Sequence, residues 1–148
     1  MKENGEQSGE KPTFTFFGGE PLLAFDTIIK PIILKYKKEL NWSITTNGTL
    51  LTEEIIDFLA DNDVSILLSF DGIKEVQDKQ RPLMDQQSSF DKIMKNLDYL
   101  VLKIPDTVFR GTLTKFSIPY LYQNMLFFEK IGAKSCAFCI DETEEYDE

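Results

Sequence analysis

The stretch VSILLSFDG at residues 64–72 decides the fold class of this chain of 148 residues. It is a nearly continuous apolar run that ends at the turn pair Asp71-Gly72, and such a run predicts a strand covered on both faces. Strand-like runs also occur at residues 13–17, 41–46, 107–114 and 133–140, and they alternate with segments of helical spacing. The order βαβαβαβαβ predicts an α/β fold with a parallel sheet and right-handed crossovers, as in a barrel, a partial barrel or a doubly wound sheet.

The helical segments have recognisable boundaries. Apolar spacing over residues 25–40 predicts a helix that Pro31 kinks or delays. Thr52 is expected to cap the next helix and Ser89 the one after it, while Ser117 is expected to open the last helix. Met125 falls on the expected buried stripe of the last helix, whose C-cap is Gly132. Residues 73–88 are polar, and we expect an irregular connection there.

Composition limits the class of protein. The chain is 42% hydrophobic with 12 phenylalanines, which excludes global disorder, and we expect the phenylalanines to lie in the core (Phe14, Phe16, Phe17, Phe127 and Phe128). The net charge is -9, and residues 141–148 carry much of the acidity. The weakly acidic body predicts neither a nucleic acid nor a membrane as partner. No apolar run approaches ~18 residues and no signal peptide is evident, so we expect a cytoplasmic protein.

The residues that are missing exclude several chemistries. The chain has no histidine, which removes Ser-His-Asp and Cys-His catalysis and any imidazole zinc site. Its two cysteines, Cys136 and Cys139, cannot supply the usual four thiolates of an iron–sulfur cluster. Residues three apart on a strand point to opposite faces, so two buried, unreactive thiols are the favoured interpretation.

Polar residues collect where the expected strands end. Gly18-Gly19-Glu20-Pro21 follows the first strand, Asn47-Gly48 the second, and Ser69 and Asp71 lie at the end of the third, while Arg110 lies within the fourth. Ligand sites of parallel α/β folds form at the carboxyl ends of the strands. The glycine pairs are also common turn formers. Arg110 within an apolar strand needs an anionic ligand or, alternatively, a structural salt bridge to Glu20 or Asp71.

The same elements carry a family resemblance. The stretches FFGGEPLL (16–23), TTNGTLLT (45–52), SFDG (69–72), DKQR (78–81) and SFDKI (89–93), in this order, resemble the radical S-adenosylmethionine (SAM) superfamily. They are most similar to the branch of anaerobic sulfatase-maturing enzymes and peptide-maturing enzymes with auxiliary clusters. The resemblance implies a six-stranded partial (β/α) barrel that holds SAM and a [4Fe–4S] cluster. It also implies a parent enzyme that cleaves SAM reductively to modify a peptide or protein.

The resemblance assigns roles to seven residues. The backbone of Gly18, Gly19 and Glu20 would meet the amino group of SAM, and Arg110 its carboxylate. Ser69 and Asp71 would serve the ribose or the carboxylate, and Asn47 would lie beside the same ligand. These roles suit the chemistry, because an ammonium needs acceptors and a carboxylate favours a guanidinium.

The chain departs from the family at the cluster. No Cys-x-x-x-Cys-x-x-Cys loop precedes Gly18, and Gln77 stands where the family commonly has a histidine. We therefore expect a truncated barrel: a polar leader (1–12), the second to sixth strands (13–140) and an acidic tail (141–148), inactive alone. The alternative is a non-catalytic relic barrel that binds a small molecule or peptide. A sugar-phosphate barrel is disfavoured, since no phosphate-binding glycine loop lies near the last strands. The unpaired first strand also predicts self-association, or a leader folded back over that edge.

Overall fold

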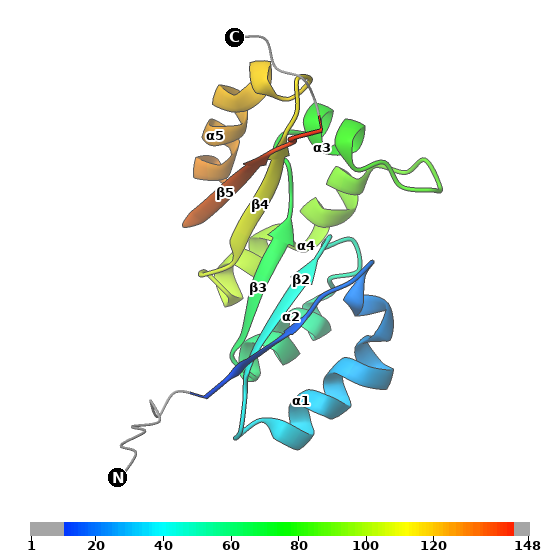
Figure 1. Ribbon diagram of the computed structural model, residues 1–148, viewed down its shortest axis with the longest axis vertical. Helices are drawn as coiled ribbons and strands as arrows, with labels where there is room; N and C mark the ends of the chain where they lie inside the picture. Colours follow the sequence, from blue (N-terminus) through cyan, green and yellow to red (C-terminus); the bar gives the residue numbers. More distant parts are fainter. Residues whose placement is uncertain (1–10, 144–148) are drawn as a thin grey trace, which may run out of the picture.

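The computed structural model describes residues 11–143, which form one five-stranded parallel sheet. The strands are β1 (Thr13–Phe16), β2 (Asn41–Thr46), β3 (Val64–Ser69), β4 (Val108–Leu113) and β5 (Ser135–Ile140). Each strand pairs with the next along the chain, in the order β1-β2-β3-β4-β5. The sheet is twisted and open, with β1 and β5 at its two edges (Figure 1). This confirms the predicted parallel, partial-barrel class.

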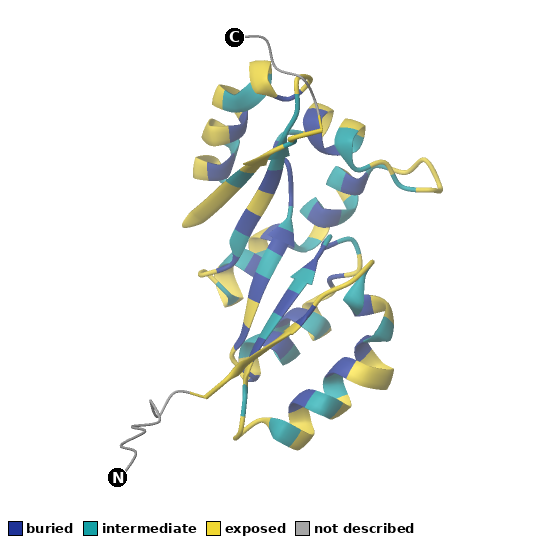
Figure 2. Cartoon of the chain, in the orientation of Figure 1, coloured by how far each residue is buried: buried dark blue, intermediate teal, exposed yellow. Residues whose placement is uncertain are grey.

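The two faces of the sheet differ in polarity because side chains alternate along each strand. On one face the strand residues are buried in a common core with the helices (Trp42, Ile44, Ile66, Leu68 and Phe109). On the other face, here called the inner face, their neighbours are exposed or half-buried (Figure 2; Ser43, Ser65, Leu67, Ser69 and Arg110). The prediction that residues 64–70 are covered on both faces is wrong for the described part of the chain, because the two serines of β3 lie on the inner face.

The helices lie in the expected order. After β1 come η1 (Pro21–Ala24), a π-helical turn η2 (Phe25–Ile29) and α1 (Lys30–Tyr36), with Pro31 in the first turn of α1 as expected. Helix α2 (Glu53–Asp61) is capped by Thr52, whose Oγ1 accepts a hydrogen bond from Ile55 N–H at 3.3 Å. Helix α4 (Ser89–Lys103) is capped by Ser88 rather than Ser89, because Ser88 Oγ accepts from Asp91 N–H at 2.9 Å.

The last helix ends at the predicted glycine, although the C-cap is Ile131 and Gly132 is the residue that follows it. A 3₁₀ turn η3 (Ile118–Tyr120) leads into α5 (Leu121–Lys130). Gly132 has a φ of 75° and its N–H bonds to the Glu129 carbonyl, while Ala133 N–H bonds to the Phe128 carbonyl. These two bonds form a Schellman motif, which satisfies the end of the helix. No helix in residues 11–143 is long and apolar enough to cross a membrane.

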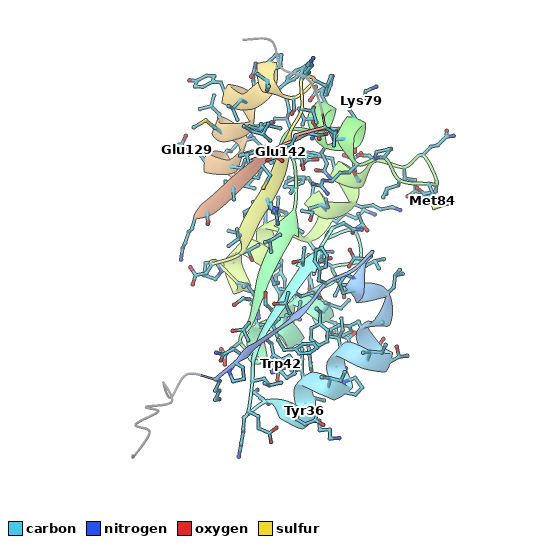
Figure 3. The ribbon with its side chains drawn as sticks, in the orientation of Figure 1. Tyr36, Trp42, Lys79, Met84, Glu129 and Glu142 are labelled. Atoms are coloured by element: carbon cyan, nitrogen blue, oxygen red, sulfur yellow. The ribbon has the colours of Figure 1, made fainter. Side chains whose placement is uncertain are left out.

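One helix was missed. Residues 74–80 form α3 (Lys74–Gln80) instead of an irregular connection. Only Val76 and Gln77 of this helix are buried, so the short helix lacks the apolar stripe that would identify it in the sequence. The loop that follows α3 projects from the molecule, with Met84 fully exposed (Figure 3).

Several side chains expected in the core lie outside it. Phe14 and Phe17 are exposed because they lie at the β1 edge, whereas Phe16 and Phe128 are buried and Phe127 is partly buried. On α5, Asn124 is buried in place of Met125. Cys136 and Cys139 are both exposed, which corrects the prediction of buried thiols, because β5 is the other edge strand. Most of the predicted leader and acidic tail falls outside the described residues.

Candidate functional site

The loop after β1 is tied to the end of β2 by one carboxylate. Glu20 Oε1 accepts from Leu22 N–H at 3.0 Å and from Thr46 Oγ1 at 2.7 Å, while Oε2 accepts from Asn47 N–H at 2.8 Å. Gly18 has a φ of 146°, which favours glycine, and a Cβ at Gly18 or Gly19 would meet no atom within 4 Å. The glycine backbone is therefore open to a ligand, while the Glu20 side chain is used to hold the loop.

Asn47 forms its own turn. Its Oδ1 accepts from Thr49 N–H at 2.9 Å and from Thr49 Oγ1 at 2.7 Å. This is the local bonding that makes Asn common in turns. The oxygen of the side-chain amide is thus occupied, and any contact of Asn47 with a ligand falls to the amide nitrogen.

Ser69 and Arg110 are neighbours on the inner face. They are register partners across β3 and β4. Arg110 is exposed, and its Nη2 lies 3.2 Å from Cys139 Sγ. In residues 11–143 no carboxylate pairs with Arg110, so the alternative of a salt bridge to Glu20 or Asp71 finds no support there. An uncompensated guanidinium beside a hydroxyl is suited to bind an anion.

The carboxylate of Asp71 is already bonded to other groups of the chain. Its side chain is 1% exposed, and its carboxylate accepts from Arg81 Nε at 2.8 Å, from Arg81 Nη2 at 3.1 Å and from Thr112 N–H at 2.8 Å. The predicted contact of Asp71 with a ligand remains untested, and this geometry gives the residue a structural role instead.

The sequence reasoning missed the polar residues that surround Asp71. Arg81 pairs with it, and Gln77 Oε1 accepts from Asp71 N–H at 2.8 Å. Gln80 donates from Nε2 to the Thr112 carbonyl at 3.0 Å, and its Oε1 accepts from Thr114 Oγ1 at 2.7 Å. The available signal was the helical spacing of Gln77 and Gln80 on α3 and of Arg81 at its C-cap, which places three polar side chains on one side.

The predicted site residues form two groups on the side of the sheet where the carboxyl ends of the strands lie. Gly18, Gly19, Glu20 and Asn47 are joined through Glu20, while Ser69, Asp71 and Arg110 are joined through the β3–β4 pairing. In the described ranges no hydrogen bond or ion pair links one group to the other. This side of the sheet is suited to a ligand that contacts both groups.

The thiols do not form a metal site. Cys139 lies on the inner face beside Arg110, while Cys136 pairs in register with Phe109, whose side chain is in the core. Within residues 11–143 no group of three His, Cys, Asp or Glu side chains could hold a metal ion. The cysteines of the described chain therefore do not fit a [4Fe–4S] cluster.

Known proteins share this architecture. The model of the family described as "Radical SAM superfamily" matches residues 1–117. The chain belongs to the radical SAM superfamily. It is similar to the cysteine-type anaerobic sulfatase-maturating enzyme of Clostridium novyi (strain NT), with 34% identity over 106 residues that cover 68% of this chain and 28% of that protein. It is also similar to the radical SAM cyclopropyl synthase TigE of Paramaledivibacter caminithermalis, with 30% identity over 117 residues, 76% of this chain and 24% of that protein.

Solved structures confirm the fold. Native anSMEcpe with bound AdoMet superposes with a TM-score of 0.81 at 24% identity, covering 96% of this chain and 42% of that one. The radical SAM partial barrel, of which the open five-stranded sheet is a part, is thus the fold of this protein. The chain spans less than half the length of these relatives.

Asp78 makes the start of α4 sensitive to acid. Burial acts to raise the pKa of Asp78, but hydrogen bonds from Phe90 N–H, Ser88 and Ser89, with Lys74 nearby, outweigh it and lower that pKa below its ordinary value. A carboxyl whose pKa is lower in the folded state stabilises the fold above its unfolded pKa of about 3.9. That stabilisation is lost as the pH falls through the lower, folded pKa.

We therefore expect Asp78→Asn to lower the free energy of unfolding at pH 7 and to have a progressively smaller effect as the pH falls below about 3.9 and through the lower, folded pKa of Asp78, because the stabilisation by the ionised carboxyl is lost over that range. Urea unfolding at several pH values, followed by Trp42 fluorescence, measures this difference. Asp98→Asn on the exposed face of α4 is the control. A constant difference between wild type and Asp78→Asn across the acid range would contradict the prediction.

Proposed function

We propose that this chain is the SAM-binding part of a radical SAM enzyme that modifies a peptide or protein. Membership of the superfamily supports SAM as the ligand. The observation that carries the proposal is the guanidinium of Arg110, exposed on the inner face and without a carboxylate partner among the described residues. A ligand carboxylate is the partner that its geometry favours.

The site residues match the polar parts of SAM one by one. The open backbone at Gly18 and Gly19 offers carbonyl acceptors for the ammonium group. Arg110 would bind the carboxylate, and Ser69, whose hydroxyl has no partner in residues 11–143, would serve the ribose or the carboxylate. Asn47 would lie beside the ligand at the end of β2. Asp71 would serve the ribose or the carboxylate only with the acceptor capacity that its three present hydrogen bonds leave.

Cleavage of SAM needs an electron from an iron–sulfur cluster, and this chain alone does not supply one. Its two cysteines are three residues apart on β5 and face opposite sides of the sheet. We therefore assign to these residues the binding and orientation of SAM, and no redox step. The lack of a cysteine triplet also favours a second candidate, a module that binds SAM or another small molecule without cleaving it.

Relatives support a peptide or protein as the substrate of the whole enzyme. Two similar proteins are named sulfatase-maturating enzymes of the cysteine and serine types. Native anSMEcpe has also been solved with AdoMet and the Cp18Cys peptide bound. That structure superposes on 93% of this chain with a TM-score of 0.80. For the present protein we propose a substrate of the same class, a peptide or a protein.

The proposed role of Arg110 predicts a specific loss of affinity. We expect Arg110→Ala to weaken SAM binding about tenfold or more, because a charge-assisted hydrogen-bond pair contributes about 1.5–3 kcal/mol. Titration of the labelled chain with SAM by NMR measures the dissociation constant. Lys95→Ala, which removes an exposed cation from α4, should leave it unchanged. Equal affinities of wild type and Arg110→Ala would remove Arg110 from the site.

We expect the 148-residue chain to form no stable [4Fe–4S] cluster after anaerobic reconstitution with iron and sulfide, because two divergent thiolates cannot hold one. Visible absorption and a 5′-deoxyadenosine assay measure the outcome. A cluster spectrum with SAM cleavage would show that the chain is active by itself. SAM binding without cleavage agrees with both the enzyme part and the binding module.

We also propose self-association through β1. The outer edge of β1 is unpaired in the described chain, and Phe14, Phe17 and Ile28 line an apolar groove of about 320 Å³ beside it. Exposed strand edges with apolar side chains favour pairing with another copy. Phe17, which is 78% exposed, should be part of the contact.

Phe17→Lys should then shift the chain toward monomer in sedimentation velocity, since a buried ammonium opposes the contact. Leu102→Lys is a matched control, because Leu102 is 75% exposed on α4, away from β1. A wild-type chain that remains monomeric at the highest concentrations measured would refute self-association.

A further inference from the structure

The Asp71 side chain continues the β3–β4 ladder after the β3 backbone has ended. The last backbone bond there runs from Phe70 N–H to the Arg110 carbonyl at 2.9 Å. Two residues further along β4, Thr112 N–H donates to Asp71 Oδ1 at 2.8 Å instead of to a β3 carbonyl. The backbone of β4 is therefore held at two points, by a backbone hydrogen bond at the Arg110 carbonyl and by a carboxylate hydrogen bond at Thr112 N–H.

The carboxylate is itself held in a fixed orientation. Arg81 binds both of its oxygens, through Nε and Nη2, in the bidentate geometry that restricts a carboxylate most strongly. The backbone N–H of Asp71 donates to Gln77 on α3, and the side chain of Asp71 is almost completely buried. Helix α3 thus sets the position of Asp71 from two sides.

The two arginines of the chain are used differently. Arg81 is neutralised by Asp71, whereas Arg110 has no carboxylate partner in residues 11–143. A carboxylate that already accepts three hydrogen bonds has little capacity left for a ligand hydroxyl. The geometry therefore separates a structural ion pair from the guanidinium that meets the ligand.

We infer that Asp71 and Arg81 are positioning residues: they fix β4 at Thr112 and so aim Arg110 at the carboxylate of SAM, without touching the ligand. The inference rests on the proposed function, in which Arg110 binds that carboxylate. The path runs from α3 through Arg81 and Asp71 to the backbone of Thr112, which is two residues from Arg110 on the same face of β4.

A ligand that lacks only the carboxylate separates this role from the alternatives. Decarboxylated SAM keeps the amino group, sulfonium, ribose and adenine. Arg81→Lys keeps the positive charge but loses the bidentate fork. We expect Arg81→Lys to weaken SAM binding about fivefold, within the range of coupling in one hydrogen-bonded network, and to leave the affinity for decarboxylated SAM unchanged. The effect should disappear when Arg110→Ala is already present.

Asp71→Asn provides a second variant, and we expect the same pattern from it. If Asp71 instead contacts the ribose, Asp71→Asn will weaken both ligands equally, and the inference is overturned. Equal losses for both ligands in Arg81→Lys would show a general structural effect and overturn it too, as would an unchanged affinity for SAM. Lys92→Gln, which breaks the exposed ion pair between Lys92 on α4 and Asp85 in the loop after α3, should change neither affinity.

The wild-type chain tests the proposed function separately. If it binds SAM no better than decarboxylated SAM, the assignment of Arg110 to the carboxylate fails before any variant is compared. If it prefers SAM and Arg81→Lys retains the full preference, the proposed function stands and only the positioning role fails. The amide NMR signals of Arg110 and Thr112 in the free protein should shift in Arg81→Lys, and those of β1 should not.

Discussion

Two carboxylates accept backbone hydrogen bonds at the carboxyl ends of the strands, beyond the last strand-to-strand bonds. The candidate site depends on them. Beyond the last backbone pair, a buried N–H without a partner costs about 1–3 kcal/mol. Glu20 Oε2 accepts from Asn47 N–H after β2, and Asp71 Oδ1 accepts from Thr112 N–H on β4. The same physical solution thus holds the β1 loop to β2 and the end of β3 to β4. Both loops become fixed points above a polar inner face.

The use of these carboxylates in the scaffold determines the charge that remains for a ligand. Asp71 is neutralised by Arg81. Glu20 accepts hydrogen bonds from two backbone N–H groups and one hydroxyl. What stays available at this edge is the glycine backbone, the Ser69 hydroxyl and the Arg110 guanidinium. Such a set offers acceptors for an ammonium and a cation for a carboxylate, which is the pattern of an amino acid headgroup.

The sequence was sufficient for the strands and insufficient for their polar supports. Strand order, the delayed α1 at Pro31 and the glycine end of α5 follow from local rules, and the structure confirms all three. Helix α3 was missed because one of its two buried residues is the polar Gln77, whose burial is explained only by its tertiary contact with Asp71. Likewise, Asp71 could be placed at the strand end, but its pairing with Arg81 depends on a helix that the pattern did not reveal. Phe17 and Cys139 are exposed because β1 and β5 each lack a neighbouring strand on one side in the described chain. The hydrophobic periodicity of the sequence does not show which strands lie at the edges of the sheet.

The position of the thiols limits what this edge of the sheet contributes. Cys139 is register partner of Thr112, so its sulfur faces the inner side and contacts Arg110, while Cys136 faces the side on which the core lies. One inward thiol can act as a weak acceptor for the guanidinium and help to orient it, but it cannot replace a set of thiolates that leaves an iron with an open coordination position. The groups that we propose as anchors for SAM lie on or directly after β1, β2, β3 and β4, where strand pairing or a carboxylate fixes them. Binding and orientation are therefore built into these strands, and delivery of an electron requires ligands that β5 does not offer.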